Sequence, residues 1–348
     1  MDALSPGSIA ALIGLLTGLV LGLSARLGNF CTLGAIETAF FGDDQRRLRL
    51  WGIVLGIAIG GTYLAASLGL AAPEESFYHT IAWNPVASIV GGLVFGYGMA
   101  MAGNCGFGAL VRFGGGDLRS LVVVVVLGIF SFVTLSGPLA PLREAVFPQT
   151  GATGPQGFAQ LAEAATGIPR LVFALAISAA AILWALSHAP LRAERVQIAW
   201  GVAAGLSVVF CLSATTWLAD ASLGAVSVEG PSFTAPLGRT IIWFMTSSGG
   251  GINLSVGIVA GVLAGAFAGS IRRGMFRWEA CEDPRELGRQ VSGAALMGIG
   301  GTLALGCSIG QGVTAMATLA YSAPLTLAAI VAGGLLGLRQ LIHGFQPE

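Results

Sequence analysis

The chain has 348 residues, of which 55% are hydrophobic and 10% charged, and its formal net charge is zero. With a mean hydropathy of +0.81, this composition lies far outside that of soluble domains and predicts an all-α, polytopic protein embedded in a lipid bilayer. The balance of 17 basic and 17 acidic residues argues against nucleic acid as a partner. Five cysteines, an odd number mostly in apolar segments, do not indicate a disulfide framework.

Nine apolar runs are long enough, or nearly so, to cross a membrane. In chain order they cover about residues 8–25, 50–71, 85–102, 118–135, 171–187, 196–218, 252–270, 291–305 and 324–342. Residues 240–245 form a further apolar piece that is too short to span, and we interpret it as a re-entrant half-helix. We expect one membrane transport domain over residues 1–348.

The basic residues, all arginine, predict the orientation of the chain in the membrane. They concentrate in the loops around residues 46–49, 112–119, 192–195 and 272–289, which the positive-inside rule places in the cytoplasm. The loops over residues 73–80, 137–169 and 220–239 are poor in arginine and fall outside. This assignment gives a periplasmic N-terminus and a cytoplasmic C-terminus.

One segment occurs twice. GGLVFGYGMAMAGNCGFG, residues 91–108, aligns without a gap on GAALMGIGGTLALGCSIG, residues 293–310, at an offset of 202 residues. Four glycines and the cysteine coincide: Gly91, Gly96, Gly98, Cys105 and Gly108 fall on Gly293, Gly298, Gly300, Cys307 and Gly310. Since the two copies are predicted to run in opposite directions, they indicate an inverted-topology repeat with a pseudo-two-fold axis. Repeat one covers about residues 8–138 and repeat two about 196–343, joined by an outer loop and helix over 139–195.

Each copy ends in a cysteine flanked by glycine, in GNCGFG at 103–108 and GCSIGQG at 306–312. Glycine-rich runs disfavour a continuous helix. A break leaves backbone N–H groups unpaired, which is tolerated at membrane depth only inside protein or beside a cavity. Those N–H groups and the N-terminus of a following half-helix attract an anion. We expect these half-helices to begin near Phe107 and Ile309.

The thiols add a preference for sulfur, because S–H is a weak donor and a soft, polarisable acceptor. The candidate substrate path therefore comprises Cys105 and Cys307, a looser third station at Cys31, and the glycines Gly106, Gly108, Gly306 and Gly310. Asn104, Ser308 and Gln311 are candidates to hold the oxygens of an anion. Arg112 either neutralises the anion at the inner mouth or is a positive-inside anchor. Buried cysteine also serves as a small apolar side chain, but the duplication favours the functional interpretation.

These motifs resemble those of the YeeE/YedE family of sulfur-transport proteins in the bacterial inner membrane. The resemblance rests on GNFCTLGA at 28–35, FGYGMAMAGNCGFGALVRFGGGD at 95–117 and MGIGGTLALGCSIGQGVTA at 297–315. It implies an hourglass-like fold with short helices meeting at the waist. It also implies thiosulfate uptake through Cys31, Cys105 and Cys307 by non-covalent S–H···S contacts, with a cytoplasmic sulfurtransferase of the TusA/YeeD type as partner.

The leading hypothesis is thus a thiosulfate transporter that is not an enzyme and needs no cofactor or metal; no GxxxxGK[ST] nucleotide motif is present. One alternative is a transporter of another sulfur or selenium anion, such as sulfite. Another is a membrane sulfurtransferase that forms a persulfide on Cys105 or Cys307. That reaction needs an activated thiolate, yet neither cysteine has a histidine nearby in the sequence.

Overall fold

A computed structural model describes residues 5–280 and 283–343. Within these ranges the chain is helical and contains no strand, only three isolated bridges. The longer helices are α1 (Pro6–Gly28), α3 (Arg46–Ser67), α5 (Pro85–Ala102), α7 (Leu118–Leu135), α10 (Arg170–Leu186), α12 (Arg195–Ala221), α13 (Ala235–Thr246), α14 (Leu254–Arg272), α15 (Pro284–Leu303) and α16 (Ser322–His343). Shorter elements are α2 (Thr32–Phe41), η1 (Pro73–Glu75), α4 (Phe77–Thr80), α6 (Gly106–Gly114), α8 (Ala140–Val146), α9 (Phe158–Thr166), α11 (Ala189–Ala193) and the π-helical turn η2 (Gly310–Ala315).

The predicted class, an all-α polytopic membrane protein, is confirmed. Seven described stretches are long and apolar enough to cross a membrane. The apolar helix α10 is shorter, at 17 residues, and α15 begins with a charged turn. The predicted number of nine crossings therefore stays a prediction. Large apolar side chains such as Leu16, Val125 and Leu183 are more than a third exposed, as expected of surfaces that face lipid.

Side-chain caps define where several helices start. The Asn84 Oδ1 atom accepts hydrogen bonds from the N–H groups of Val86 and Ala87 at the start of α5. Asp117 caps α7 through Arg119 N–H, and Asn253 caps α14. Such caps satisfy N–H groups that have no partner within the helix.

The glycine-rich helices α5 and α15 cross closely at the centre of the molecule. A Cβ atom added to Gly91 would lie 2.7 Å from Gly300 O, and one added to Gly98 would lie 2.5 Å from Gly293 O. The two helices are therefore antiparallel, and the duplicated positions contact each other reciprocally. Reciprocal contacts of this kind are those that a two-fold axis produces.

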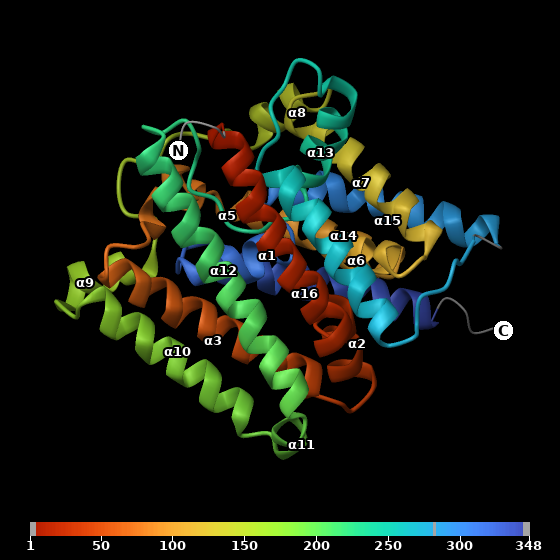
Figure 1. Ribbon diagram of the computed structural model, residues 1–348, viewed down its shortest axis with the longest axis horizontal. Helices are drawn as coiled ribbons and strands as arrows, with labels where there is room; N and C mark the ends of the chain where they lie inside the picture. The colour runs from red at the N-terminus through yellow and green to blue at the C-terminus, as the bar shows by residue number, and fades with distance from the viewer. Residues whose placement is uncertain (1–4, 281–282, 344–348) are drawn as a thin grey trace.

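Helix α5 also packs in parallel against α16, with Gly96 against Ile330 and Gly92 against Thr326. On the other side of the molecule α1 runs parallel to α14, with Gly7 beside Ile252. Figure 1 shows α1, α12, α3 and α10 as successive neighbours, in agreement with the contacts between them. These pairings agree with the inverted repeat, whose boundaries remain a prediction.

The four arginine-rich loops gather at one end of the bundle, which we call the arginine end. Arg46 pairs with Glu194 at 3.5 Å, and Arg119 pairs with Glu279 at 3.3 Å. The loops predicted to lie outside meet at the opposite end, where Arg170 contacts Glu74 and Trp83 N–H donates to Gln156. The predicted division of loops between two ends is thus observed. Which end faces the cytoplasm remains a prediction.

Candidate functional site

Cys105 lies at the break between α5 and α6. Gly103 ends α5 with a φ of +74°, a conformation that glycine adopts without strain. Cys105 then takes the N-cap position of α6, and its Sγ accepts a hydrogen bond of 3.4 Å from Gly108 N–H. The thiol is 1% exposed. The predicted helix break and the predicted start of the half-helix are both observed within one residue.

Cys307 occupies the corresponding break after α15. Its Sγ accepts a hydrogen bond of 3.3 Å from Gly310 N–H, the same spacing of three residues as in Cys105–Gly108. A second N–H, that of Phe233, donates to the same sulfur at 3.2 Å, and the Ser232 hydroxyl lies 3.8 Å away. The Cys307 sulfur is therefore surrounded by hydrogen-bond donors in a site that is 2% exposed.

Cys31 is the N-cap residue of α2, where Asn29 ends α1 with a φ of +57°. All three predicted cysteines thus stand at the N-terminal ends of short helical segments. Cys105 lies near enough to Cys31 and to Cys307 to interact electrostatically with both. The structure therefore brings the three predicted thiols to one region. Cys211 is buried in α12, and its thiol donates to the Glu229 carbonyl at 3.6 Å.

The predicted polar residues surround the same breaks. Ser308 Oγ accepts a hydrogen bond of 3.1 Å from Thr32 Oγ1, which connects the start of α2 to the second break. Gln311 is fully buried, donates to Ala304 O at 2.7 Å and accepts from Ser322 at 3.1 Å. These two hydrogen bonds connect the Gln311 amide to the residue that follows α15 and to the start of α16, and so hold the backbone of the second break in place. Asn104 is 3% exposed, and its Oδ1 has no hydrogen-bond partner among the described residues.

A cavity lies at each end of this region. The cavity at the end opposite the arginine end, which we call the outer cavity after its predicted side, has a volume of about 270 Å³ and is lined by Glu229, Ser232, Thr234, Arg239, Thr302 and Gly306. The arginine cavity, about 240 Å³, is lined by Arg26, Arg47, Arg112 and Arg273 together with Cys31 and Asn104. Ser232 belongs to the outer cavity and approaches Cys307, whereas Cys31 belongs to the arginine cavity. The thiols therefore extend from one cavity toward the other.

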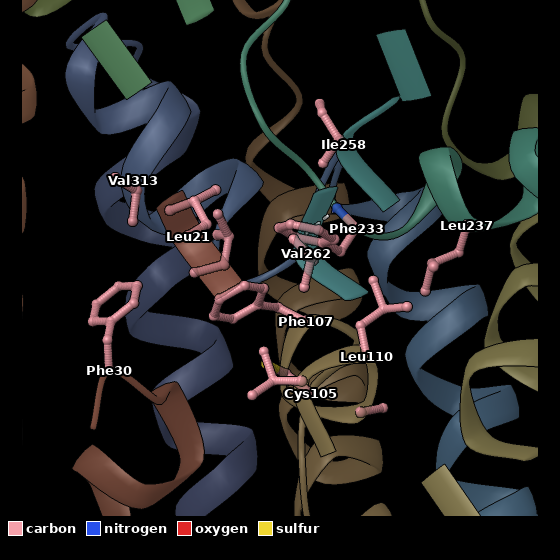
Figure 2. Packing of buried hydrophobic residues seen from close by; sticks show 14 of the residues in the cluster. Leu21, Phe30, Cys105, Phe107, Leu110, Phe233, Leu237, Ile258, Val262 and Val313 are labelled. Carbon is pink, nitrogen blue, oxygen red and sulfur yellow. Dashed lines mark hydrogen bonds between the residues drawn. The ribbon is translucent and has the colours of Figure 1, made fainter. Parts of the chain in front are cut away.

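Aromatic rings fill the space beside the thiols. Figure 2 shows Phe107 between Phe30 and Phe233, with Cys105 close by. The ring centroids of Phe107 and Phe233 are 5.0 Å apart, and those of Phe30 and Phe107 are 6.3 Å apart. Phe107 and Phe233 are almost completely buried. Phe107 lines the arginine cavity and Phe233 N–H contacts Cys307 Sγ, so these rings form an apolar segment next to the thiols, which we call the constriction.

Sequence reasoning did not find the segment that brings Ser232 and Phe233 to Cys307. It also missed the ion pair of Arg239 with Glu229, 3.3 Å apart, at the outer cavity. A signal was present, because the offset of 202 residues that pairs Cys105 with Cys307 also pairs Cys31 with Phe233. Extending the repeat beyond the cysteine motifs would have pointed to this loop.

The bundle has a polar cavity near either end and broken helices between the cavities. This is the architecture of a membrane transporter. The sequence model of the sulphur transport family matches residues 27–336, and the chain belongs to that family. This confirms the family that the cysteine motifs predict.

Two relatives are similar over nearly their full length. The thiosulfate transporter TsuA of Spirochaeta thermophila is 26% identical over 330 residues, which cover 89% of this chain and 92% of the relative. The thiosulfate transporter TsuA of Escherichia coli is 23% identical over 334 residues, which cover 92% of each. Both alignments extend across the two cysteine breaks and the segment between them.

Proposed function

We propose that this protein takes up thiosulfate across the bacterial inner membrane, from the outer cavity to the arginine cavity. The anion passes Cys307, Cys105 and Cys31 by S–H···S contacts, without a covalent intermediate. The observation that carries this proposal is the position of three thiols at helix N-termini between two cavities. The names of the two relatives support thiosulfate as the substrate.

The hydrogen bonding of the sulfur atoms suits them to this role. The sulfurs of Cys105 and Cys307 accept backbone N–H groups, so each S–H proton is free to turn toward an anion. Thiosulfate offers a terminal sulfur as a soft acceptor, and weak contacts permit both binding and release. The N-termini of the short helices favour the negative charge that arrives with it.

The aromatic constriction supports selectivity. Phe107 and Phe233 offer no hydrogen bonds to replace the hydration of an oxyanion, and removing polar groups from water without compensation is costly. Thiosulfate recovers part of that cost through its contacts with the thiols. Sulfate has no sulfur acceptor to present, so we expect the constriction to reject it.

In this proposal the arginine end faces the cytoplasm, so the N-terminus is periplasmic and the C-terminus cytoplasmic. The excess of arginine in the loops at this end supports that orientation. A cytoplasmic sulfurtransferase of the TusA/YeeD type would receive the anion at the same end and keep its free concentration low. Uptake would then follow the concentration gradient of thiosulfate.

Uptake of labelled thiosulfate into proteoliposomes tests the path. We expect Cys105→Ala and Cys307→Ala each to lower the initial rate about tenfold or more, because a lost hydrogen bond to an ion is worth about 1.5–3 kcal/mol. Cys211→Ala is the matched control, since this thiol is equally buried but lies within the continuous helix α12 and not at a helix break. Equal rates in all four proteins would show that the cysteines are packing residues and would refute the proposed path.

A further inference from the structure

The arginine cavity concentrates positive charge without a carboxylate to balance it. Arg26 comes from α1, Arg47 from the first turn of α3, Arg112 from α6, and Arg273 caps α14. None of the described residues that line this cavity is acidic. None of the four guanidinium groups has an ion-pair partner among the described residues.

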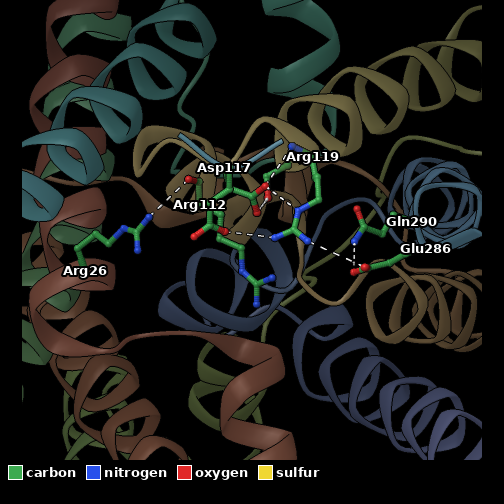
Figure 3. Close-up of polar contacts among 8 residues, drawn as sticks. Arg26, Arg112, Asp117, Arg119, Glu286 and Gln290 are labelled. Atoms are coloured by element: carbon green, nitrogen blue, oxygen red, sulfur yellow. Dashed lines mark hydrogen bonds and ion pairs between the residues drawn. The ribbon is translucent and has the colours of Figure 1, made fainter. Parts of the chain in front are cut away.

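Five other arginines pair with carboxylates: Arg46, Arg119, Arg143, Arg170 and Arg239. Arg119 contacts Asp117 at 3.2 Å and Glu279 at 3.3 Å, so the carboxylates nearest to the cavity already have a partner. Figure 3 shows this cluster, with the guanidinium group of Arg112 pointing away from it. Asp117 and Glu279 also attract Arg26, but both carboxylates pair with Arg119, and no carboxylate of the described residues forms an ion pair with an arginine of the cavity.

Two of the arginines are held in place by backbone carbonyl groups. Arg26 Nη2 donates to Val111 O at 3.0 Å, and Arg273 Nη2 donates to Leu27 O at 2.6 Å. Arg26 also lies close enough to Arg112 and Arg273 for their charges to repel each other. Holding like charges together costs free energy that a bound anion would recover.

Two buried polar groups in the cavity wall have no hydrogen-bond partner within residues 5–280 and 283–343. The Arg26 Nε donor is unsatisfied, and so is Oδ1 of the Asn104 amide, which is 3% exposed. Buried polar groups without a partner are rare and call for an explanation. Rotation of the amide would present its NH2 group to an anion.

The volume and the donors define the ligand. Guanidinium groups match oxyanions through paired N–H···O bonds. At about 30 Å³ per water molecule, the cavity has room for one small oxyanion with part of its hydration shell. Arg112 and Arg273 are exposed, so the site opens to the solution at the arginine end.

We propose that the arginine cavity is a second anion-binding site, which holds small divalent oxyanions by charge whether or not they contain terminal sulfur. Building on the proposed function, this site receives thiosulfate after the thiols and is also open to sulfate from the cytoplasm. Sulfate that cannot pass the constriction binds here and slows the release of thiosulfate. The thiols thus select for sulfur, and the arginine cavity selects for charge.

Equilibrium binding of radiolabelled sulfate to the purified full-length chain tests this inference. Arg47→Gln and Arg112→Gln are the informative variants, because their side chains make no hydrogen bond within the described structure. We expect each to weaken sulfate binding about tenfold, with partial recovery in Arg47→Lys. Arg192→Gln is the control, since Arg192 is exposed near the same end but lies outside the cavity.

Two results would overturn the inference: no sulfate binding to the native chain, or binding that Arg47→Gln and Arg112→Gln leave unchanged. The experiment also separates this site from the proposed function. If the native chain binds sulfate through these arginines but does not take up thiosulfate, the anion site stands and the transport proposal fails. If the native chain takes up thiosulfate but does not bind sulfate, the transport proposal stands and the anion site fails.

Discussion

Glu229 and Arg239 place opposite charges at the outer cavity. Their ion pair, 3.3 Å long, partly satisfies the guanidinium group, while the side chain of Glu229 is only 21% exposed. A carboxylate in this position repels an incoming dianion and competes with it for Arg239. In the proposed path, the pair would therefore set how strongly the outer cavity attracts thiosulfate.

Replacing Glu229 with Gln should lower the KM for thiosulfate uptake severalfold, because it removes a negative charge and frees Arg239. Arg239→Gln should raise the KM by a similar factor. Uptake rates at a series of thiosulfate concentrations measure both changes. Asp220→Asn serves as the control, since Asp220 is an exposed acid near the same end that does not line the cavity. An unchanged KM in Glu229→Gln would contradict the role given to the pair.

For individual residues, the sequence predicts the cysteines of the site better than the residues that surround them. Cys105 and Cys307 are found because their glycine-rich context is duplicated within the chain. Phe233 N–H and Ser232 reach Cys307 from a loop more than 70 residues earlier. Contacts over such separations depend on tertiary packing, which local motifs do not encode.

Helix α5 depends on glycine for its close packing. A Cβ atom added to Gly96 would lie 2.0 Å from Ile330 O of α16, where neither backbone can yield without separating the helices. Small residues allow transmembrane helices to approach to this distance. The glycines that reveal the repeat in the sequence are therefore also the residues that allow the helices to cross.

Gly96→Ala should destabilise the protein by about 1–3 kcal/mol, the usual cost of overpacking a tightly packed interface. Gly288→Ala is the matched control in α15, where an added Cβ meets no atom within 4 Å and should stabilise the helix by up to about 1 kcal/mol. Thermal unfolding of the detergent-solubilised protein measures both. A melting temperature in Gly96→Ala equal to that of the native chain would refute the close crossing of α5 and α16.

Long apolar runs and arginine-rich loops predict most of the long helices and the two groups of loops. The half-helix expected at residues 240–245 is found as the longer α13. The short helix α2 is not predicted, because its separation from α1 depends on the left-handed conformation of Asn29. Such breaks depend on single residues and on the neighbours that satisfy their backbone groups.

In the whole molecule, two cavities of similar volume lie on either side of the broken helices. The antiparallel crossing of α5 and α15 gives the central region its two-fold character. The ends nevertheless differ in charge: the outer cavity contains an ion pair, whereas the four arginines of the other cavity have no ion-pair partner in the described part of the chain. This difference favours movement of a dianion toward the arginine end.

The central claim is that thiosulfate crosses intact. Thiosulfate is prepared in two forms, one labelled on the terminal sulfur and one on the central sulfur. Uptake of each form into proteoliposomes shows directly whether the ion crosses intact. The account predicts equal uptake of both labels, recovered inside as thiosulfate, and an equal loss of both in Cys105→Ala. The opposite result is that the terminal label stays on the protein as a persulfide while the central label remains outside as sulfite. That result would contradict the transport of intact thiosulfate.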